Sequence, residues 1–185
     1  HAERALPALD RFMKDRGLGP DNLKAVVVNI GPGSFTGVRV GVSMAKALAF
    51  ALKIAVVSVT SLEVIAARLF RDPANQSLVL ATIDARRGEE FAGVFSNTGQ
   101  QIGELVVHNP ALTDEWATKL SQGRSLIRVE AGATAQAADL LWLGEQKLAR
   151  QEVANPNTLE PAYVREPDAT PMAVATSPIF GYERE

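Results

Sequence analysis

A glycine-rich run, GPGSFTGVRVG at residues 31–41, constrains this chain more than any other feature of its sequence. The segment before it, residues 25–30 (AVVVNI), is typical of a buried strand, and the segment after it, residues 43–52 (SMAKALAFAL), is typical of a helix. Glycines allow dihedrals and close backbone approach that other residues resist, and Ser34 or Thr36 can cap the helix. The run therefore predicts a strand, a tight turn and a helix whose first N–H groups can receive an anion.

The spacing of this run does not fit three standard templates for phosphate binding or catalysis. A dinucleotide fingerprint would need its third glycine at position 36, which is Thr36. A P-loop that begins at Gly31 or Gly33 would need a glycine five residues later, followed by lysine, and those positions are Thr36 and Val38. A nucleophile elbow around Ser34 would also need glycine at Thr36. Two interpretations stay open, a turn that only joins strand to helix and a loop that binds an anion or nucleotide. The residues of the second interpretation are Gly31, Gly33, Ser34, Thr36, Gly37 and Arg39.

The first 70 residues alternate between helical and strand patterns. Apolar residues spaced three and four apart predict the first helix, and Thr60 or Ser61 with Glu63 predicts the start of another. The predicted elements are a helix at 2–17, a strand at 24–30, a helix at 36–52, a strand at 54–59 and a helix at 61–70. Strand–helix–strand segments of this length predict a parallel βαβ unit.

A polar connector at residues 71–77 separates this unit from a different pattern, and it is the predicted domain boundary. Short apolar runs after it are joined by glycine-containing turns at 86–88 and 97–99, which predicts a meander. The predicted elements are strands at 78–84, 90–95 and 102–107, a helix at 113–120 capped by Thr113, a strand at 125–129 and a helix at 134–150.

Composition excludes several classes of protein. The 185 residues carry a net charge of −2, and no basic run is longer than Arg86–Arg87, so an autonomous nucleic-acid binder is not expected. The chain has no cysteine, which excludes disulfides and thiol catalysis and fits a cytoplasmic protein. No uninterrupted apolar stretch reaches the length of a membrane span, and the amino terminus does not resemble a signal peptide.

The titratable residues indicate no catalytic or metal site. His1 and His108 are the two histidines, they are far apart in sequence, and His108 is expected to be exposed at a strand end. Glu89 and Glu90 are adjacent in a strand, so their side chains should point to opposite faces. Asp84 is expected to stabilise the turn that follows it. We therefore predict no catalytic residue and no bound metal.

The helix after the glycine run is apolar on nearly all sides. Ser43, Ala47 and Phe50 lie at i, i+4 and i+7 and form one stripe, with Lys46 beside it. A helix of this kind is either deeply buried or part of an interface. The residues alone leave both interpretations open.

The glycine run and the VVSVTSLE segment at 56–63 together resemble the signature of the TsaB family, also called YeaZ. Three further segments agree with this family: the start at residues 1–7, residues 83–91 (IDARRGEEF) and residues 160–165 (EPAYVR). The family is the bacterial accessory subunit in threonylcarbamoyladenosine synthesis on tRNA.

The resemblance implies an α/β fold of the actin-like type (ASKHA, ribonuclease H-like) with two lobes. It implies a first lobe at 1–72, a second lobe at 77–166 and an irregular tail at 167–185. Members of the family begin with three strands, so roughly 30 residues, including the amino-terminal hairpin of the first lobe, are expected to be missing here.

The resemblance also implies a noncatalytic subunit that partners TsaD, with TsaE, in modifying adenosine 37 of tRNA. Its contact with tRNA would be made only through the complex, with no intrinsic cofactor and with ATP or ADP only at the complex interface. TsaD carries a metal-binding His-x-x-x-His where this chain has Ser61 and Ile65. A homodimer is expected in the absence of TsaD, and a nucleotide-dependent enzyme or peptidase is the remaining alternative. The partner-interface residues that the resemblance implies are Leu6, Leu9, Phe12, Met13, Ser43, Lys46, Ala47 and Phe50.

Overall fold

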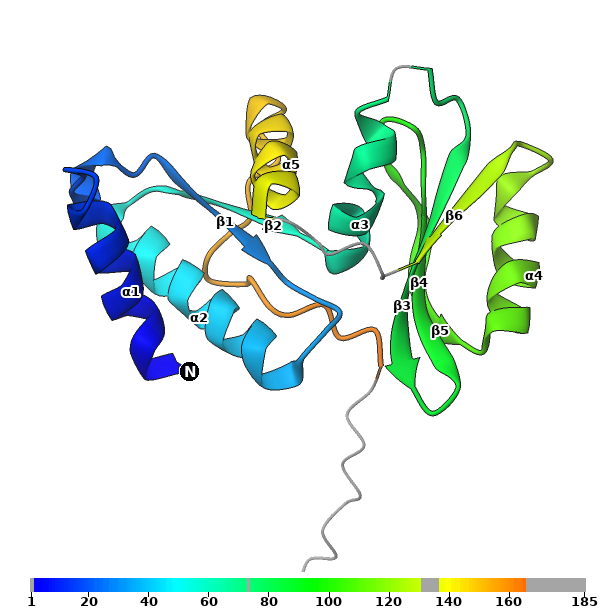
Figure 1. Cartoon of the computed structure of the whole chain (residues 1–185), viewed down its shortest axis with the longest axis horizontal. Coiled ribbons are helices and arrows are strands. Elements are labelled where there is room, and N and C mark those ends of the chain that lie inside the picture. The colour runs from blue at the N-terminus through cyan, green and yellow to red at the C-terminus, as the bar shows by residue number, and fades with distance from the viewer. Residues whose placement is uncertain (1, 73, 131–136, 166–185) are drawn as a thin grey trace, which may run out of the picture.

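The computed structural model describes residues 2–72, 74–130 and 137–165, and these form a mixed α/β structure with two sheets. The elements are α1 (Ala2–Lys14), a 3-10 turn (Pro20–Asn22), β1 (Ala25–Asn29), α2 (Phe35–Leu52), β2 (Ala55–Val59), α3 (Ser61–Phe70), β3 (Leu78–Arg86), β4 (Glu89–Phe95), β5 (Gln101–His108), α4 (Pro110–Ser121), β6 (Leu126–Glu130) and α5 (Ala137–Ala149). Figure 1 shows the two sheets on opposite sides of the molecule.

The first sheet is the predicted parallel βαβ unit. Strands β1 and β2 pair from Ala25 opposite Ala55 to Asn29 opposite Val59, and α2 is the crossover between them. Because α2 places an alanine or valine at each turn of its buried side, it packs closely on the strands. The core residues of this layer are Val28, Val42, Ala45, Ala49, Val56 and Leu159.

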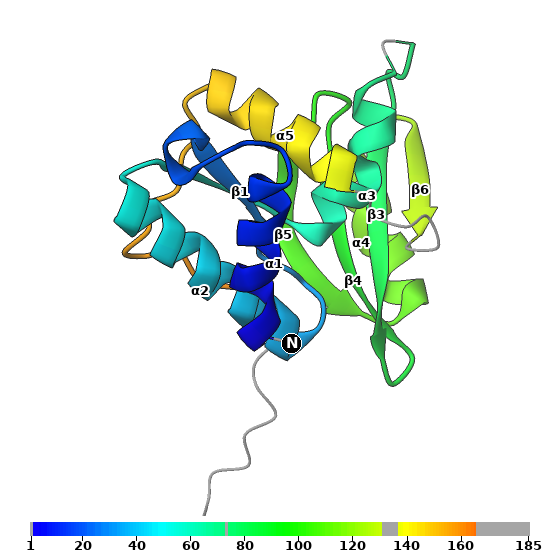
Figure 2. The ribbon, with the colours of Figure 1, turned by 60° about the vertical axis from the view of Figure 1, so that its left-hand side comes forward.

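The second sheet has the strand order β5-β4-β3-β6. Strands β3, β4 and β5 form the predicted antiparallel meander, and β6 pairs in parallel with β3. The alternation of side chains along β3 assigns its even-numbered residues Leu78 and Leu80 to the face under α4 and its odd-numbered residues Val79 and Ala81 to the face under α3. Figure 2 shows α3 and α4 in relation to this sheet.

Helices α3 and α5 connect the two sheets. One side of α3, with Leu62 and Ala66, packs on β3, while Val64 and Ala67 pack against β2 and Leu143 of α5. After α5 the chain returns to the first sheet, where the Ala154 N–H donates to Val56 O at 2.8 Å. The structure thus places α5 and the segment 154–162 on the first sheet, whereas the resemblance implied a second lobe at 77–166.

Local signals explain most element boundaries, and the structure corrects two of them. Helix α1 ends at Lys14, before the predicted end at 17, because a turn closed by Gly17 at a φ of +66° follows it. Thr60 and Glu63 form a reciprocal capping box at the start of α3, as predicted. Helix α4 begins at Pro110, three residues before the predicted start, because the Asn109 side chain accepts the Leu112 N–H and proline is favoured in the first turn. Thr113 is consequently a fully buried residue inside the helix and not its cap. The predicted start of the last helix at 134 lies outside the described residues.

Among the described residues, α2 has the length and composition that a membrane span would need. The helix that covers a sheet in a globular protein passes the same test. Helix α2 carries Arg39 and Lys46, which interrupt its apolar sequence, and its small residues pack on β1. Its apolar character is explained by this packing and by the exposed face considered below.

The contact between α5 and β1 leads to a stability prediction. A Cβ added at Gly144 in α5 would lie 2.2 Å from Cγ2 of Val27, whereas one added at Gly41 in α2 would lie 3.9 Å from the nearest atom of Val28. We expect Gly144→Ala to lower the free energy of unfolding by about 1–3 kcal/mol through overpacking. Gly41→Ala should leave it unchanged or raise it by up to about 1 kcal/mol because alanine favours the helix. Urea unfolding of both variants tests this, and equal stability of the two would contradict it.

Candidate functional site

The glycine loop joins the end of β1 to the start of α2, and its first half is a buried turn. Gly31 has a φ of +95°, which favours glycine, and both Gly31 and Pro32 are buried. The Gly31 N–H donates to Asn29 Oδ1 at 2.8 Å, and the Ser61 N–H donates to Gly31 O, also at 2.8 Å. These bonds tie β1 to the start of α3, so Gly31 serves the fold.

The second half of the loop is exposed. Gly33, Ser34, Thr36 and Gly37 all face solvent. Ser34 is the helix cap and accepts the Gly37 N–H at 3.4 Å, so the predicted alternative cap, Thr36, is not used. The structure therefore separates Gly31 from the remaining candidate residues of an anion loop, which stay together at the start of α2.

Arg39, the last candidate of this loop, contacts two aromatic residues, Phe35 and Tyr163. Its Cζ atom lies 3.7 Å from the centroid of the Phe35 ring and 5.7 Å from that of Tyr163, and its Nε–H donates to Tyr163 Oη at 3.1 Å. Sequence reasoning did not find this contact, because Tyr163 lies more than a hundred residues further along the chain.

A groove of about 540 Å³ runs beside the loop, along β1 and α2. Its walls are mostly apolar, with Val26 and Val28 of β1, Met44 and Leu48 of α2, and Leu9 of α1. Within the part of the chain that the structure describes, β1 pairs with β2 on one edge and with no strand on the other. Asn29, Ser34, Gly37 and Ser61 add polar groups to this lining, so the groove joins an apolar wall to the exposed half of the glycine loop.

The predicted interface residues lie on α1 and α2, which are neighbours in both views (Figures 1 and 2). Large apolar side chains are about half exposed here: Leu6 at 47%, Phe12 at 53% and Phe50 at 52%. Ser43 and Ala47 are exposed beside Phe50. These residues form the α1/α2 face.

Three of the predicted interface residues are less accessible. Leu9 is half-buried, and the Met13 side chain is buried. The Lys46 ammonium donates to Leu159 O at 3.1 Å, which fixes the carboxyl-terminal segment on α2.

Ser61 and Ile65, the positions at which the resemblance implied histidines in TsaD, make contacts within the fold. Ser61 Oγ donates to Asn29 Oδ1 at 3.0 Å, and Ile65 lies in the apolar core between α3 and β3. No group of three or more potential metal ligands occurs among the described residues.

One buried ion pair fastens α5 to α3. Lys147 Nζ lies 2.6 Å from Glu63 Oε1, donates to Ser58 O at 3.0 Å, and is 18% exposed. The same Glu63 carboxylate accepts the Thr60 N–H at 2.6 Å through Oε2. Sequence analysis found the cap but missed the lysine, because only the folded chain brings α5 to this point.

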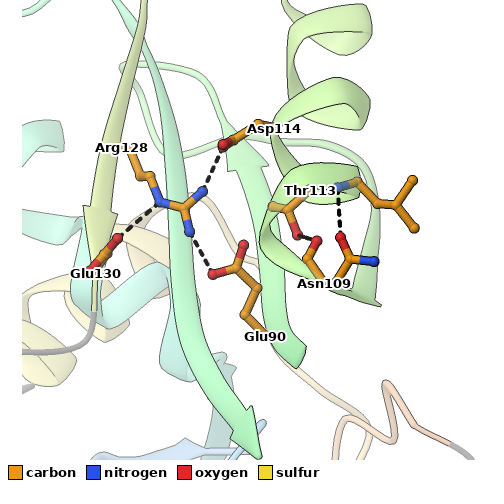
Figure 3. A network of polar contacts seen from close by, with 7 residues as sticks. Glu90, Asn109, Thr113, Asp114, Arg128 and Glu130 are labelled. Carbon is orange, nitrogen blue, oxygen red and sulfur yellow. Dashed lines mark hydrogen bonds and ion pairs between the residues drawn. The ribbon is translucent and has the colours of Figure 1, made fainter. Parts of the chain in front are cut away.

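A second polar network surrounds Arg128 on the α4 side of the second sheet (Figure 3). Its guanidinium lies 2.5 Å from Glu90, 2.6 Å from Asp114 and 3.1 Å from Glu130. Burial lowers the pKa of Arg128, but the hydrogen bond and charge of Glu90, with Glu130 and Asp114, outweigh it, so its pKa lies above the usual value. Glu90 is buried, and its Oε1 has no hydrogen-bond partner within the described residues.

The other polar residues of this end stabilise turns and strands. Glu89 bonds Arg165 while Glu90 bonds Arg128, so the two adjacent carboxylates do not form a pair. Asp84 accepts the Arg86 N–H at 2.7 Å, as predicted for a turn residue. His108 was expected to be exposed, but it is half-buried and its ring meets that of Trp116 edge-on at 6.3 Å.

Comparison with known proteins identifies the family. Residues 1–154 match the family model of TsaD, described as tRNA N6-adenosine threonylcarbamoyltransferase. The chain is 31% identical over 166 residues to the tRNA threonylcarbamoyladenosine biosynthesis protein TsaB of Haemophilus influenzae, covering 86% of this chain and 68% of that protein. The chain belongs to the TsaB (YeaZ) family.

Two further matches agree with the TsaB assignment. The TsaB protein of Bacillus subtilis is 36% identical over 124 residues, and the match covers 66% of this chain and 52%, about half, of that protein. The solved structure of YeaZ from Pseudomonas aeruginosa superposes with a TM-score of 0.67 at 28% identity, covering 88% of this chain and 84% of that one.

The Arg128 network gives a second stability prediction. We expect Arg128→Met to lower the free energy of unfolding by about 3 kcal/mol, because Glu90 is then left buried without a counter-charge. Adding Glu90→Met should recover at least about 1 kcal/mol of this loss in a double-mutant cycle.

The matched control is Lys119→Met, which breaks the exposed pair with Glu115. It should change the stability by less than about 1 kcal/mol. Additive effects of the Arg128 and Glu90 substitutions in urea unfolding would contradict the importance of this pair.

Proposed function

We propose that this chain is a noncatalytic subunit in the synthesis of threonylcarbamoyladenosine on tRNA, acting in the cytoplasm with TsaD and TsaE. Membership of the TsaB family supports the pathway, and the α1/α2 face is the observation that supports a partner. Leu6, Phe12 and Phe50 on neighbouring helices are each about half exposed. We propose that they form one exposed apolar patch of the kind that marks interaction sites. We further propose that the two sheets correspond to the two lobes of an actin-like fold.

The absence of catalysis is part of this proposal. Ser61 and Ile65 occupy hydrogen-bonded and apolar positions, so neither is placed to hold a metal. Gly31 is bound into the fold, which favours a structural role for the first half of the glycine loop. The subunit would thus hold no cofactor of its own, would meet ATP or ADP only at the interface of the complex, and would reach tRNA through that complex.

The same face favours a second assembly. When TsaD is absent, the exposed side chains of α1 and α2 would still be driven together by burial of their apolar surface. A homodimer through the α1/α2 face is therefore the alternative, and it would compete with TsaD for the same residues.

Reconstitution tests the noncatalytic role. The purified chain should form no threonylcarbamoyladenosine from tRNA and threonylcarbamoyl-adenylate, since it lacks the ligands that would hold a catalytic metal. Addition of TsaD and TsaE should restore the product, measured by mass spectrometry of digested tRNA. Product formed by the chain alone would overturn the proposal.

Substitution of Ala47 tests the face itself. Ala47→Glu puts a charge in the middle of the α1/α2 face, and an unpaired charge in a closed interface costs several kcal/mol, enough to abolish a micromolar complex. Because Ala47 is exposed in the free chain, its melting temperature should stay nearly the same.

Ala111→Glu, at an exposed position of α4, is the matched control and should leave association unchanged. Sedimentation with and without TsaD separates the outcomes. Retained association of Ala47→Glu, or its global unfolding, would reject this face.

A further inference from the structure

The residues around Arg39 form an exposed stack that the proposed partner face does not use. Phe35 is 56% exposed and Tyr163 is 48% exposed, and the Arg39 guanidinium, near the start of α2, contacts both. The carboxyl-terminal segment, orange in Figure 1, passes this point on its way to the second sheet. We name Phe35, Arg39 and Tyr163 the stacking surface.

Two contacts hold the Arg39 guanidinium in place. Its Cζ atom lies over the Phe35 ring at 3.7 Å from the centroid, within cation–π distance, and its Nε–H donates to Tyr163 Oη at 3.1 Å. Tyr163 itself is positioned by the backbone bond from the Ala162 N–H to Ile30 O at 2.8 Å. Exposed aromatic side chains are thus preorganised, which lowers the entropic cost of binding a flat ligand.

The charge of Arg39 is also available. Arg71, Arg128 and Arg165 each bond a carboxylate, whereas within the described residues Arg39 has no acidic partner. The glycine loop beside it is exposed from Gly33 to Gly37, so a ligand has access to the stack.

We propose that the stacking surface receives an unpaired base of an RNA loop. Aromatic rings and arginine planes are the groups on which proteins stack unpaired bases, and a guanidinium without an acidic partner attracts the neighbouring phosphate. The choice of RNA over a protein partner rests on the proposed function, in which the substrate is tRNA. The surface deepens that function by giving the subunit a contact of its own inside the complex.

The test uses the complex of the full chain with TsaD and TsaE and a fluorescein-labelled anticodon stem-loop RNA. A stacked base contributes about 1–3 kcal/mol, so Phe35→Ala should weaken RNA binding by roughly tenfold in fluorescence anisotropy. Phe35→Trp should retain binding because it keeps an aromatic face. Tyr163→Ala should weaken binding as Phe35→Ala does, which guards against a folding artefact at one position.

Leu141→Ala is the matched control, since Leu141 is a 56% exposed apolar residue on α5, away from the stack. Its RNA affinity should equal that of the wild type. Association with TsaD is measured on the same samples by sedimentation and should be unchanged in every variant.

Several outcomes would overturn the stacking surface. The first is equal RNA affinity of Phe35→Ala and of the Leu141→Ala control. The second is that Phe35→Ala loses association with TsaD while its RNA affinity is unchanged, which would make the surface a protein contact. Displacement of the RNA by AMP at equal concentration would assign the stack to free nucleotides. If the complex forms product while Phe35→Ala has no effect, the stacking surface fails and the proposed function stands; if the complex neither binds RNA nor forms product, both fail.

Discussion

The fold depends on the attachment of α5 to the first sheet, which has two strands among the described residues. Two parallel strands cannot bury both of their faces without help, because parallel sheets are stable only when each face is covered. Helix α2 covers one face as the crossover of the βαβ unit. Helix α5 covers the other face, although the whole second sheet lies between β2 and α5 in the sequence. The absence of a side chain at Gly144 lets α5 approach Val27 closely, and the Lys147–Glu63 bond fixes it against α3.

This arrangement makes α3 the helix that packs against both sheets. Its cap, its ion pair and its two apolar sides bind it to the first sheet, the second sheet and α5 at once. Substitution of Glu63 would therefore remove a helix cap and leave Lys147 buried without its counter-charge. A change that loosens α3 is expected to loosen both sheets together, and the two halves should unfold as one unit.

The sequence predicted the elements that local patterns define. The βαβ unit, the glycine turn and the meander follow from apolar periodicity and from turn residues, and Thr60 with Glu63 marks the start of α3 correctly. What it could not predict were contacts that only the folded chain makes. Two of them join distant segments: the return of α5 to the first sheet and the hydrogen bond between Arg39 and Tyr163. The third is the ring contact of His108 with Trp116, which depends on how α4 packs beside β5. The start of α4 was misplaced because Thr113 has the chemistry of a cap, but Asn109 before Pro110 is the stronger signal.

Helix α2 carries both of the proposed surfaces. One side of it, with Val42, Ala45 and Ala49, packs on the first sheet, and the exposed residues of the two surfaces lie near its two ends. The first two turns, with Phe35 and Arg39, lie next to Tyr163 of the carboxyl-terminal segment and expose an aromatic ring and a positive charge. The later turns, with Ala47 and Phe50, expose apolar side chains. Because the two surfaces lie on one rigid helix, a partner bound to the apolar end would fix the orientation of the stacking end. One helix could then position an RNA base relative to the partner's active site without any catalytic residue of its own.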